Sequence, residues 1–473
     1  MAPISYLLER DMYTVSEKHT VLAASCLAIF VNPLAGTMLN LALSAIQKDF
    51  LCSEHQLGWV ASVYFIVSVI FLLPSAKLAD IYGKKKVFLS GALIALVGVI
   101  LSMFSPNIIM LYIFRGITGI GMAAISSTSV SMISDVYEPF ERGPALALNT
   151  ACVYIGAAIG PTLGGVVTEF LGWRAIFTIL IPFLLGAFFF MSRFGYNIKS
   201  TPGKHFDLMG SVVYGTAILV FMFGLISLPQ LYAIIMMAVG SLIFVCFILM
   251  EIRESNPLVK LSIFRNTRFS RSMLALLLNY SASYCVAFFM SRYLQEIGAL
   301  TPTQAGLIMM VQSVVQVFFT LWAGRVATRM DMRILPTLGM MVTCCALGMM
   351  LFVTKTLNIP LLVASLATLG MGMGLFSAPN TIAVMSYVRK EQYNSASGLI
   401  ATVRQFGMMV SMGIATCMIS VFLGADTVLE PSNYDTFMLI LRYAFATCLV
   451  FCAVGAVFSW FRGSSFTGDD ISS

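Results

Sequence analysis

Residues 57–103 read LGWVASVYFIVSVIFLLPSAKLADIYGKKKVFLSGALIALVGVILSM, which is two long apolar runs joined by a short basic turn at residues 76–86. A helix that crosses the hydrocarbon layer of a bilayer needs about 20 mostly apolar residues. The run before the turn approaches that length and the run after it does as well. This stretch therefore predicts two membrane-spanning helices that meet in a tight polar loop.

The pattern repeats along the whole chain of 473 residues, of which 59% are hydrophobic and only 10% charged. Soluble proteins carry about 25% charged residues, so the composition indicates an all-α integral membrane protein. We count fourteen apolar runs, and the sequence predicts fourteen transmembrane helices. They begin near Val21, Leu57, Val87, Ile108, Ala145, Ala175, Leu208, Ala233, Met273, Ala305, Leu335, Pro360, Ala396 and Phe437.

The positions of Lys and Arg predict the orientation. With the N-terminus inside, inner segments hold 21 basic residues and outer segments only 5, and basic loops stay on the cytoplasmic side. We therefore predict a multi-pass protein of the cell membrane with both termini cytoplasmic. No cleaved signal peptide is expected, so the run from Val21 is a retained first span. The net charge of +7 reflects these loops and does not indicate nucleic-acid binding. The five outer residues are Lys48, Arg174, Arg292, Lys355 and Arg442.

Several other classes of protein are excluded by what the sequence lacks. No phosphate-binding G-x-x-x-x-G-K-[ST] motif is present, which argues against an ATP-driven pump. A membrane enzyme would need an intramembrane cluster of acids, histidines or metal ligands, and the spans carry none. Nine of the ten cysteines lie inside apolar runs, as small buried residues do. We expect no catalytic residues, no metal site and no cofactor.

Two basic turns indicate an internal repeat. Residues 76–85 after the second span resemble residues 324–333 after the tenth, since both turns are short and basic. Repeated halves around a central site are typical of transporters. We predict a six-helix bundle at residues 1–200, an inserted helix pair with an amphipathic linker at 201–271, and a second six-helix bundle with a short tail at 272–473.

The turn at 76–86 resembles the loop signature G-x-L-A-D-R-x-G-R-R of the major facilitator superfamily. Asp80, Gly83, Lys84 and Lys85 match, whereas Ala76 and Ile81 depart from it. The resemblance implies that this loop latches two bundles on the cytoplasmic side through charge-assisted hydrogen bonds. The alternative is a basic loop that sets topology only.

Residues 156–165 in the fifth span, GAAIGPTLGG, resemble the G-x-x-x-G-P-x-x-G-G motif of export members of that superfamily. Gly156, Gly160 and Gly164 would permit close helix approach and Pro161 would bend the helix. A moving interface and plain tight packing both remain open.

Further matches extend the resemblance to most of the chain. They are Arg115 with Gly119 and Gly121 in the fourth span and residues 404–407 in the far half. Together they resemble the second drug:proton antiporter family, the fourteen-helix branch associated with multidrug efflux.

One departure from that family concerns protons. The first span usually carries D-x-T-x-x-N-x-A-L-P, and here Ala35 stands at the acidic position. No carboxylate or histidine is expected near the middle of the membrane, so any proton would be handled nearer the span ends. The candidates are Asp80, Asp135, Glu169 and Glu296.

Two arginines, Arg115 and Arg404, fall deep inside spans. Ionised residues at such depth are costly and usually face a partner or a wet cavity. They would favour anionic or neutral cargo, or else bind helix carbonyls structurally. Other polar residues within spans would bind substrate or join helices, and the candidates are Asn40, Asn149, Tyr154, Asn279, Tyr280, Tyr284, Gln312, Gln316 and Asn380.

We therefore expect a monomeric secondary transporter in the lipid bilayer that exports small molecules or drugs by alternating access, with protons as the coupling ion. The alternatives are an importer or facilitator of a small anionic or neutral metabolite, and a membrane sensor without transport. Substrate identity is not readable from the sequence.

Overall fold

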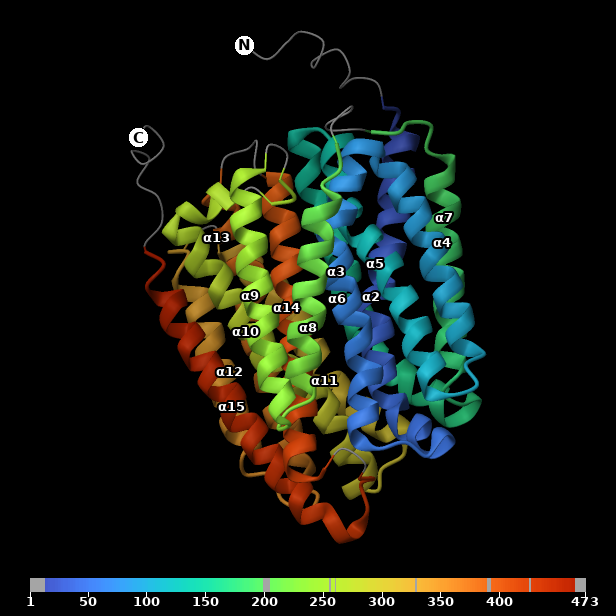
Figure 1. The fold of residues 1–473 in the computed structure, drawn as a ribbon, viewed down its shortest axis with the longest axis vertical. Coiled ribbons are helices and arrows are strands. Elements are labelled where there is room, and N and C mark those ends of the chain that lie inside the picture. The colour runs from blue at the N-terminus through green and yellow to red at the C-terminus, as the bar shows by residue number, and fades with distance from the viewer. Residues whose placement is uncertain are drawn as a thin grey trace.

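The computed structural model describes residues 13–198, 205–254, 257–259, 261–327, 330–388, 393–424 and 427–463, and these parts of the chain are helical with short connections. Fourteen long helices run along one direction (Figure 1). They are α2 (Val15–Phe50), α3 (Glu54–Tyr82), α4 (Lys84–Met103), α5 (Ile108–Val136), α6 (Pro139–Leu171), α7 (Ala175–Arg193), α8 (Leu208–Ile226), α9 (Leu231–Arg253), α10 (Thr267–Arg292), α11 (Pro302–Val326), α12 (Ile334–Met350), α13 (Ile359–Ser386), α14 (Tyr393–Phe422) and α15 (Tyr434–Trp460).

Each predicted span corresponds to one of these helices, and the prediction of an all-helical membrane fold is confirmed. Thirteen of the helices are long and apolar enough to cross a membrane, and α12 is an apolar helix of 17 residues. Apolar side chains such as Ile235, Leu242 and Leu249 of α9 are exposed on the outside of the bundle. Exposed apolar faces of this extent suit contact with lipid. The chain is a multi-pass membrane protein.

Many helix starts are fixed by local sequence. Thr14, Ser53 and Thr301 each begin a capping box, in which the hydroxyl accepts from the third backbone amide of the helix and that residue's side chain accepts from the cap. The turn between α3 and α4 requires Gly83, whose φ of +109° is disfavoured for residues with a side chain. These signals explain why the loops are so short.

We call the two ends of the bundle the basic end, which contains the turn at Gly83, and the far end, which contains the turn at 51–53. The start of α2 and the end of α15 both lie at the basic end (Figure 1). An even number of long helices separates the start of α2 from the end of α15, which agrees with their position at the same end.

Helices α2 to α7 pack mainly against one another, and so do α10 to α15. We call these sets the first half and the second half. Helices α8 and α9 form a pair that lies against α3 and α14 (Figure 1). The two halves meet most extensively where α6 packs against α11 and where α3 packs against α14. Any relative movement of the halves must therefore change these two contacts.

Candidate functional site

The cations of the turn at 83–86 are bound within the first half. Lys84 is almost fully buried and its ammonium pairs with Asp135 of α5. Lys85 donates to the carbonyl oxygens of Phe194, at the end of α7, and of Ser192, the second at 3.2 Å. A lysine that binds the last carbonyls of a helix stabilises its C-terminus. Both predicted latch cations thus tie this turn to α5 and α7.

The predicted latch acid behaves differently. Asp80 is partly buried near the end of α3 and makes no hydrogen bond or ion pair within the described part of the chain. Its carboxylate is therefore available for a partner in another arrangement of the halves. The latch role of this residue stays a prediction.

Three glycines of the motif in α6 face α2, inside the first half. A Cβ atom added at Gly156 would lie 2.6 Å from the carbonyl oxygen of Phe30, and one at Gly164 would lie 2.6 Å from the Cα of Met38. At Gly160 it would lie 1.8 Å from the hydroxyl oxygen of Thr37. These glycines permit close packing of α2 on α6.

The next glycine of the same motif faces the other half. A Cβ atom at Gly165 would lie 2.3 Å from the carbonyl oxygen of Pro302 in α11, and one at Gly306 would lie 2.4 Å from that of Pro161. The contact between halves thus depends on Gly165 and Gly306. Gly165 belongs to the sequence motif at 156–165, but spacing in the motif did not distinguish it from the glycines that face α2.

Arg115 lies deep in the first half. Its side chain is 3% exposed, and its Nε donates to the carbonyl oxygen of Val60 at 2.7 Å. Its guanidinium carbon lies 5.3 Å from the ring centre of Tyr64, whose hydroxyl donates to Asn32 at 2.6 Å. No carboxylate lies within ion-pair distance of Arg115 among the described residues. Tyr284 of α10 approaches the same region, with its hydroxyl oxygen 3.1 Å from the position of a Cβ at Gly36.

A second polar group lies between α6, α10, α13 and α14. The hydroxyl of Tyr154 and that of Ser377 are 3.2 Å apart, across the two halves. Arg404 is half-buried and interacts with the buried Tyr280. Asn279 is 1% exposed, and neither its amide nitrogen nor its oxygen has a hydrogen-bond partner. Buried amides are normally satisfied, so these atoms are suited to bind water or cargo.

Asn149 of α6 is also buried, and its amide nitrogen makes no geometrically regular hydrogen bond, although its side chain interacts with the Cys26 thiol. The other polar candidates contact neighbouring helices, and three of these contacts are made by backbone atoms. Asn40 accepts through its backbone oxygen from Ser291 at 2.5 Å. Asn380 is held by buried Arg462 at 2.8 Å. Gln312 and Gln316 of α11 pack closely on Gly370 and Gly374 of α13.

The carboxylates predicted to handle protons lie in different surroundings. Asp135 pairs with Lys84, as described above. Glu169 is exposed and accepts from the backbone nitrogen of Thr303 in the second half at 3.0 Å. Glu296 accepts from Arg292 at 3.0 Å. Two of the four candidates therefore take part in contacts at the far end.

A buried charged group at the far end was not predicted. Glu54 and Arg292 are both 0% exposed, and the guanidinium of Arg292 donates to both carboxylate oxygens of Glu54, through Nε at 3.1 Å and through Nη2. The Nη1 atom also donates to Ser44 at 2.5 Å, and Nη2 donates to Gln47. Sequence reasoning placed Glu54 at a span end and Arg292 in an outer loop, where charges are usually solvated. Only the approach of the two halves buries them.

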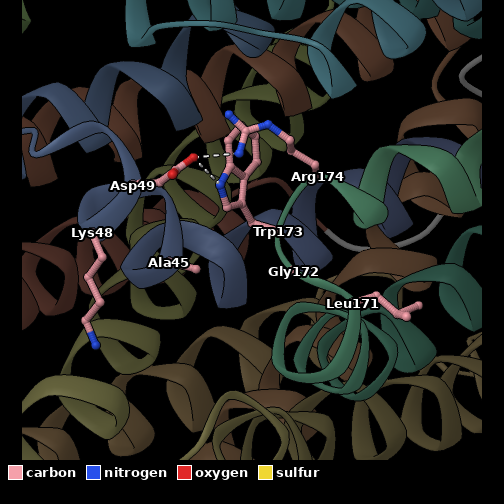
Figure 2. A pocket seen from close by; sticks show the side chains of 7 residues that line it. All are labelled: Ala45, Lys48, Asp49, Leu171, Gly172, Trp173 and Arg174. Carbon is pink, nitrogen blue, oxygen red and sulfur yellow. Dashed lines mark hydrogen bonds and ion pairs between the residues drawn. The ribbon is translucent and has the colours of Figure 1, made fainter.

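A shallow hollow of about 500 Å³ at the far end offers a contrast. Figure 2 shows that Asp49 of α2 binds both neighbours at the α6–α7 turn, the indole of Trp173 at 3.0 Å and the guanidinium of Arg174 at 2.6 Å. Arg174 also stacks on Trp173, with 4.3 Å from its guanidinium carbon to the ring centre. This ion pair joins elements of the first half only.

Among the described residues, no group of three or more His, Cys, Asp or Glu side chains comes together. Two thiols, those of Cys285 and Cys448, lie close together in the second half, with their sulfurs 3.4 Å apart.

Comparison with known proteins gives consistent results. The sequence model of the Major Facilitator Superfamily matches residues 25–412 and residues 272–470. The chain is 28% identical over 418 residues to the multidrug resistance protein Stp of Mycobacterium tuberculosis, covering 87% of this chain and 77% of Stp. It is 25% identical over 454 residues to the riboflavin transporter RibZ of Clostridioides difficile, covering 94% and 98%. Among solved structures, a bacterial homologue of the lysosomal transporter Spinster in an inward-facing, unoccupied conformation superposes with a TM-score of 0.69 at 17% identity, covering 95% and 98% of the two chains.

Proposed function

Since this chain belongs to the major facilitator superfamily and is a membrane transporter by family and fold, we propose that it exports small molecules from the cytoplasm by alternating access. The two halves, with the helix pair between them, would rock around a central site so that each end opens in turn. In this proposal the basic end faces the cytoplasm, because the sequence assigns 21 Lys and Arg residues to segments on that side and only 5 to segments on the other.

The proposal rests mainly on the location of the contacts between the two halves. Among the described residues, most hydrogen bonds between the halves lie at the far end, as in Arg292 to Glu54, Ser291 to the Asn40 carbonyl and the Thr303 amide to Glu169. Close backbone packing at Gly165 and Gly306 lies in the same part of the α6–α11 contact. We interpret this arrangement as the state that is closed to the outside, which is the state that takes up cargo for export.

The proposed cargo is argued from the two arginines that lie inside the helical bundle. Arg115 and Arg404 have no carboxylate partner among the described residues, while the buried amides of Asn279 and Asn149 have polar atoms without regular hydrogen bonds. A buried cation without a counter-ion favours a ligand that supplies negative charge or strong acceptors. The site therefore fits anionic, zwitterionic or neutral polar molecules better than lipophilic dications.

Import of a metabolite is the competing function, because one relative is named for a metabolite rather than for drugs and its name states no direction. The relative RibZ, matched over nearly its whole length, is named a riboflavin transporter, whereas Stp is named a multidrug resistance protein.

The test is transport by purified protein in sealed proteoliposomes. A panel of labelled organic anions, neutral compounds and dications is loaded on either side, with and without an imposed pH gradient. We expect protein-dependent flux of an anion or neutral compound out of the compartment that faces the basic end. Arg404→Gln should reduce anion flux by about tenfold or more, because it removes a cation from the site, whereas Arg404→Lys should retain part of it. Flux restricted to dications, or equal flux in all three proteins, would contradict the proposed site.

A further inference from the structure

The contact between Glu54 and Arg292 joins residues 238 positions apart in the chain and on different halves. Glu54 is the first residue of α3, and its backbone nitrogen also donates to the carbonyl of Thr427 before α15, at 3.1 Å. Arg292 is the last residue of α10. The first residue of α3 is thus bound to the second half through both its side chain and its backbone.

The bonding of Arg292 is dense. Its three nitrogens donate to side chains on three elements, namely Ser44 and Gln47 of α2, Glu54 of α3, and Glu296 of the π-helical turn η3 (Tyr293–Ile297). The side-chain nitrogen of Gln47 donates in turn to Glu54 at 2.8 Å. This group, which we call the Arg292 cluster, is fully hydrogen-bonded, as a buried charge must be to remain ionised.

The energetics of a buried ion pair suit a contact that opens better than a contact that is permanent. A buried ion pair can often be replaced by apolar residues without loss of stability, whereas removal of one partner is strongly destabilising. The ion pairs within the first half, Lys18 with Glu141, Lys84 with Asp135 and Arg174 with Asp49, each leave the carboxylate at least a quarter exposed to solvent. The pair that joins the halves is different, because Glu54 and Arg292 are both 0% exposed. Ser44, Gln47, Glu54 and Arg292 can all be hydrated when separated. Glu296 also stays with Arg292 on the same helical segment, so the arginine keeps one partner after Glu54 departs.

We propose that the ion pair between Arg292 and Glu54 is the gate that holds the far end closed and that must separate before the transporter opens on that side. The inference rests on alternating access in the proposed function. It goes further by assigning the gating residues, which neither the family signature loop nor the α6 glycines contain.

The chain carries its own reporter of this gate. Cys52 lies two residues before Glu54 and is 2% exposed. Burial and the nearby Glu54 raise the pKa of its thiol to about 11, while Arg292 acts in the opposite direction. At neutral pH only about one thiol in ten thousand is then ionised, against roughly one in a hundred for an ordinary thiol. Opening of the gate would both expose and activate Cys52.

The experiment measures alkylation of Cys52 by a membrane-impermeant maleimide, resolved from the other cysteines by peptide mass spectrometry, in parent and Arg292→Gln protein. Electrostatics alone predicts slower labelling, because removal of the positive charge raises the thiol pKa further. Gate opening predicts faster labelling, and we expect a rise of about tenfold or more. Arg292→Lys, which retains the charge but not the planar set of donors, should fall between the parent and Arg292→Gln.

The matched control is Arg174→Gln, which breaks the ion pair with Asp49 at the same end but within the first half. It should change Cys52 labelling by less than about twofold. An increase equal to that of Arg292→Gln would overturn the proposal, since it would indicate general loosening of the far end.

A second readout uses spin labels in a background without native cysteines. Labels at the exposed positions Phe170 and Phe352 report the distance between halves, and labels at Phe104 and Phe170 report the first half alone. Both Arg292→Gln and Glu54→Gln should lengthen the first distance and preserve the second. The gate proposal is overturned if the Phe170–Phe352 distance is unchanged. It is also overturned if Cys52 labelling in Arg292→Gln is unchanged or slower. Loss of the second distance in both variants also overturns it, because the pair would then be a folding element. None of these readouts needs flux, so a parent that transports nothing would refute the proposed function and leave the gate to be judged separately.

Discussion

A single methyl group at Gly165 should shift the balance between the two states of the transporter. The Cβ atom of Gly165→Ala would lie 2.3 Å from the carbonyl oxygen and 2.8 Å from the carbonyl carbon of Pro302. Both are backbone atoms, so the clash cannot be relieved by a side-chain rotation. The start of α11 must move away from α6 by roughly 1 Å to restore ordinary contact.

Overpacking of this kind costs about 1–3 kcal/mol. Under the proposed mechanism, the cost applies to the state in which the far end is closed and is relieved when the halves separate there. A penalty of that size corresponds to a shift of about 5- to 150-fold toward the open far end. The distance between labels at Phe170 and Phe352 measures this shift, since a long-distance population should appear or grow.

The control is Gly160→Ala in the same helix. Its Cβ would meet the hydroxyl of Thr37, at 1.8 Å, inside the first half. Both states contain that contact, so thermal stability should fall while the ratio of states stays near that of the parent. If Gly160→Ala opens the far end and Gly165→Ala does not, the assignment of the moving contact is wrong.

Three further predictions concern orientation, the latch and coupling. A cysteine placed at Lys355, which pairs with Asp435 at the far end, should react with an impermeant reagent from outside sealed cells; reaction of a cysteine at Lys85 under the same conditions would reverse the orientation. Asp80→Asn should lower transport strongly at nearly unchanged expression if the partly buried carboxylate finds its partner when the basic end closes; equal flux in mutant and parent would remove Asp80 from the mechanism. Flux should depend only weakly on the pH gradient, because Asp135, Glu169 and Glu296 lie near span ends and are bound to other groups. The opposite result would be export of a lipophilic dication that depends steeply on the pH gradient. If that export persisted after these three residues and Asp80 were neutralised, it would falsify this view of coupling.

The helices could be predicted from the sequence because bilayer thickness imposes a simple rule on length and apolarity. The α3–α4 turn could be predicted as well, since Gly83 and the lysines around it are local signals. The partners of those lysines could not be predicted. Lys84 binds Asp135 and Lys85 binds the end of α7, and both contacts depend on how α4, α5 and α7 pack.

The Arg292 cluster could not be predicted from the sequence either. In the sequence, Glu54 lies near a span end and Arg292 falls in an outer segment, and each resembles a solvated charge. Their burial arises only when two halves separated by 238 positions come together. Likewise, Gly160 and Gly165 are equivalent in a motif, and only the direction in which each faces decides whether it contacts α2 or α11.

Alternating access is tested most directly by a reversible cross-link across the far end. In a background without native cysteines, the pair Glu169→Cys with Thr303→Cys spans the halves, where the carboxylate of Glu169 accepts from the Thr303 amide at 3.0 Å. The pair Asp49→Cys with Arg174→Cys, whose side chains contact each other at 2.6 Å, lies within the first half. We predict that a short bifunctional thiosulfonate reagent abolishes flux in proteoliposomes for the first pair and leaves it for the second, and that reduction restores it. Full flux through protein cross-linked between Glu169→Cys and Thr303→Cys would contradict the account.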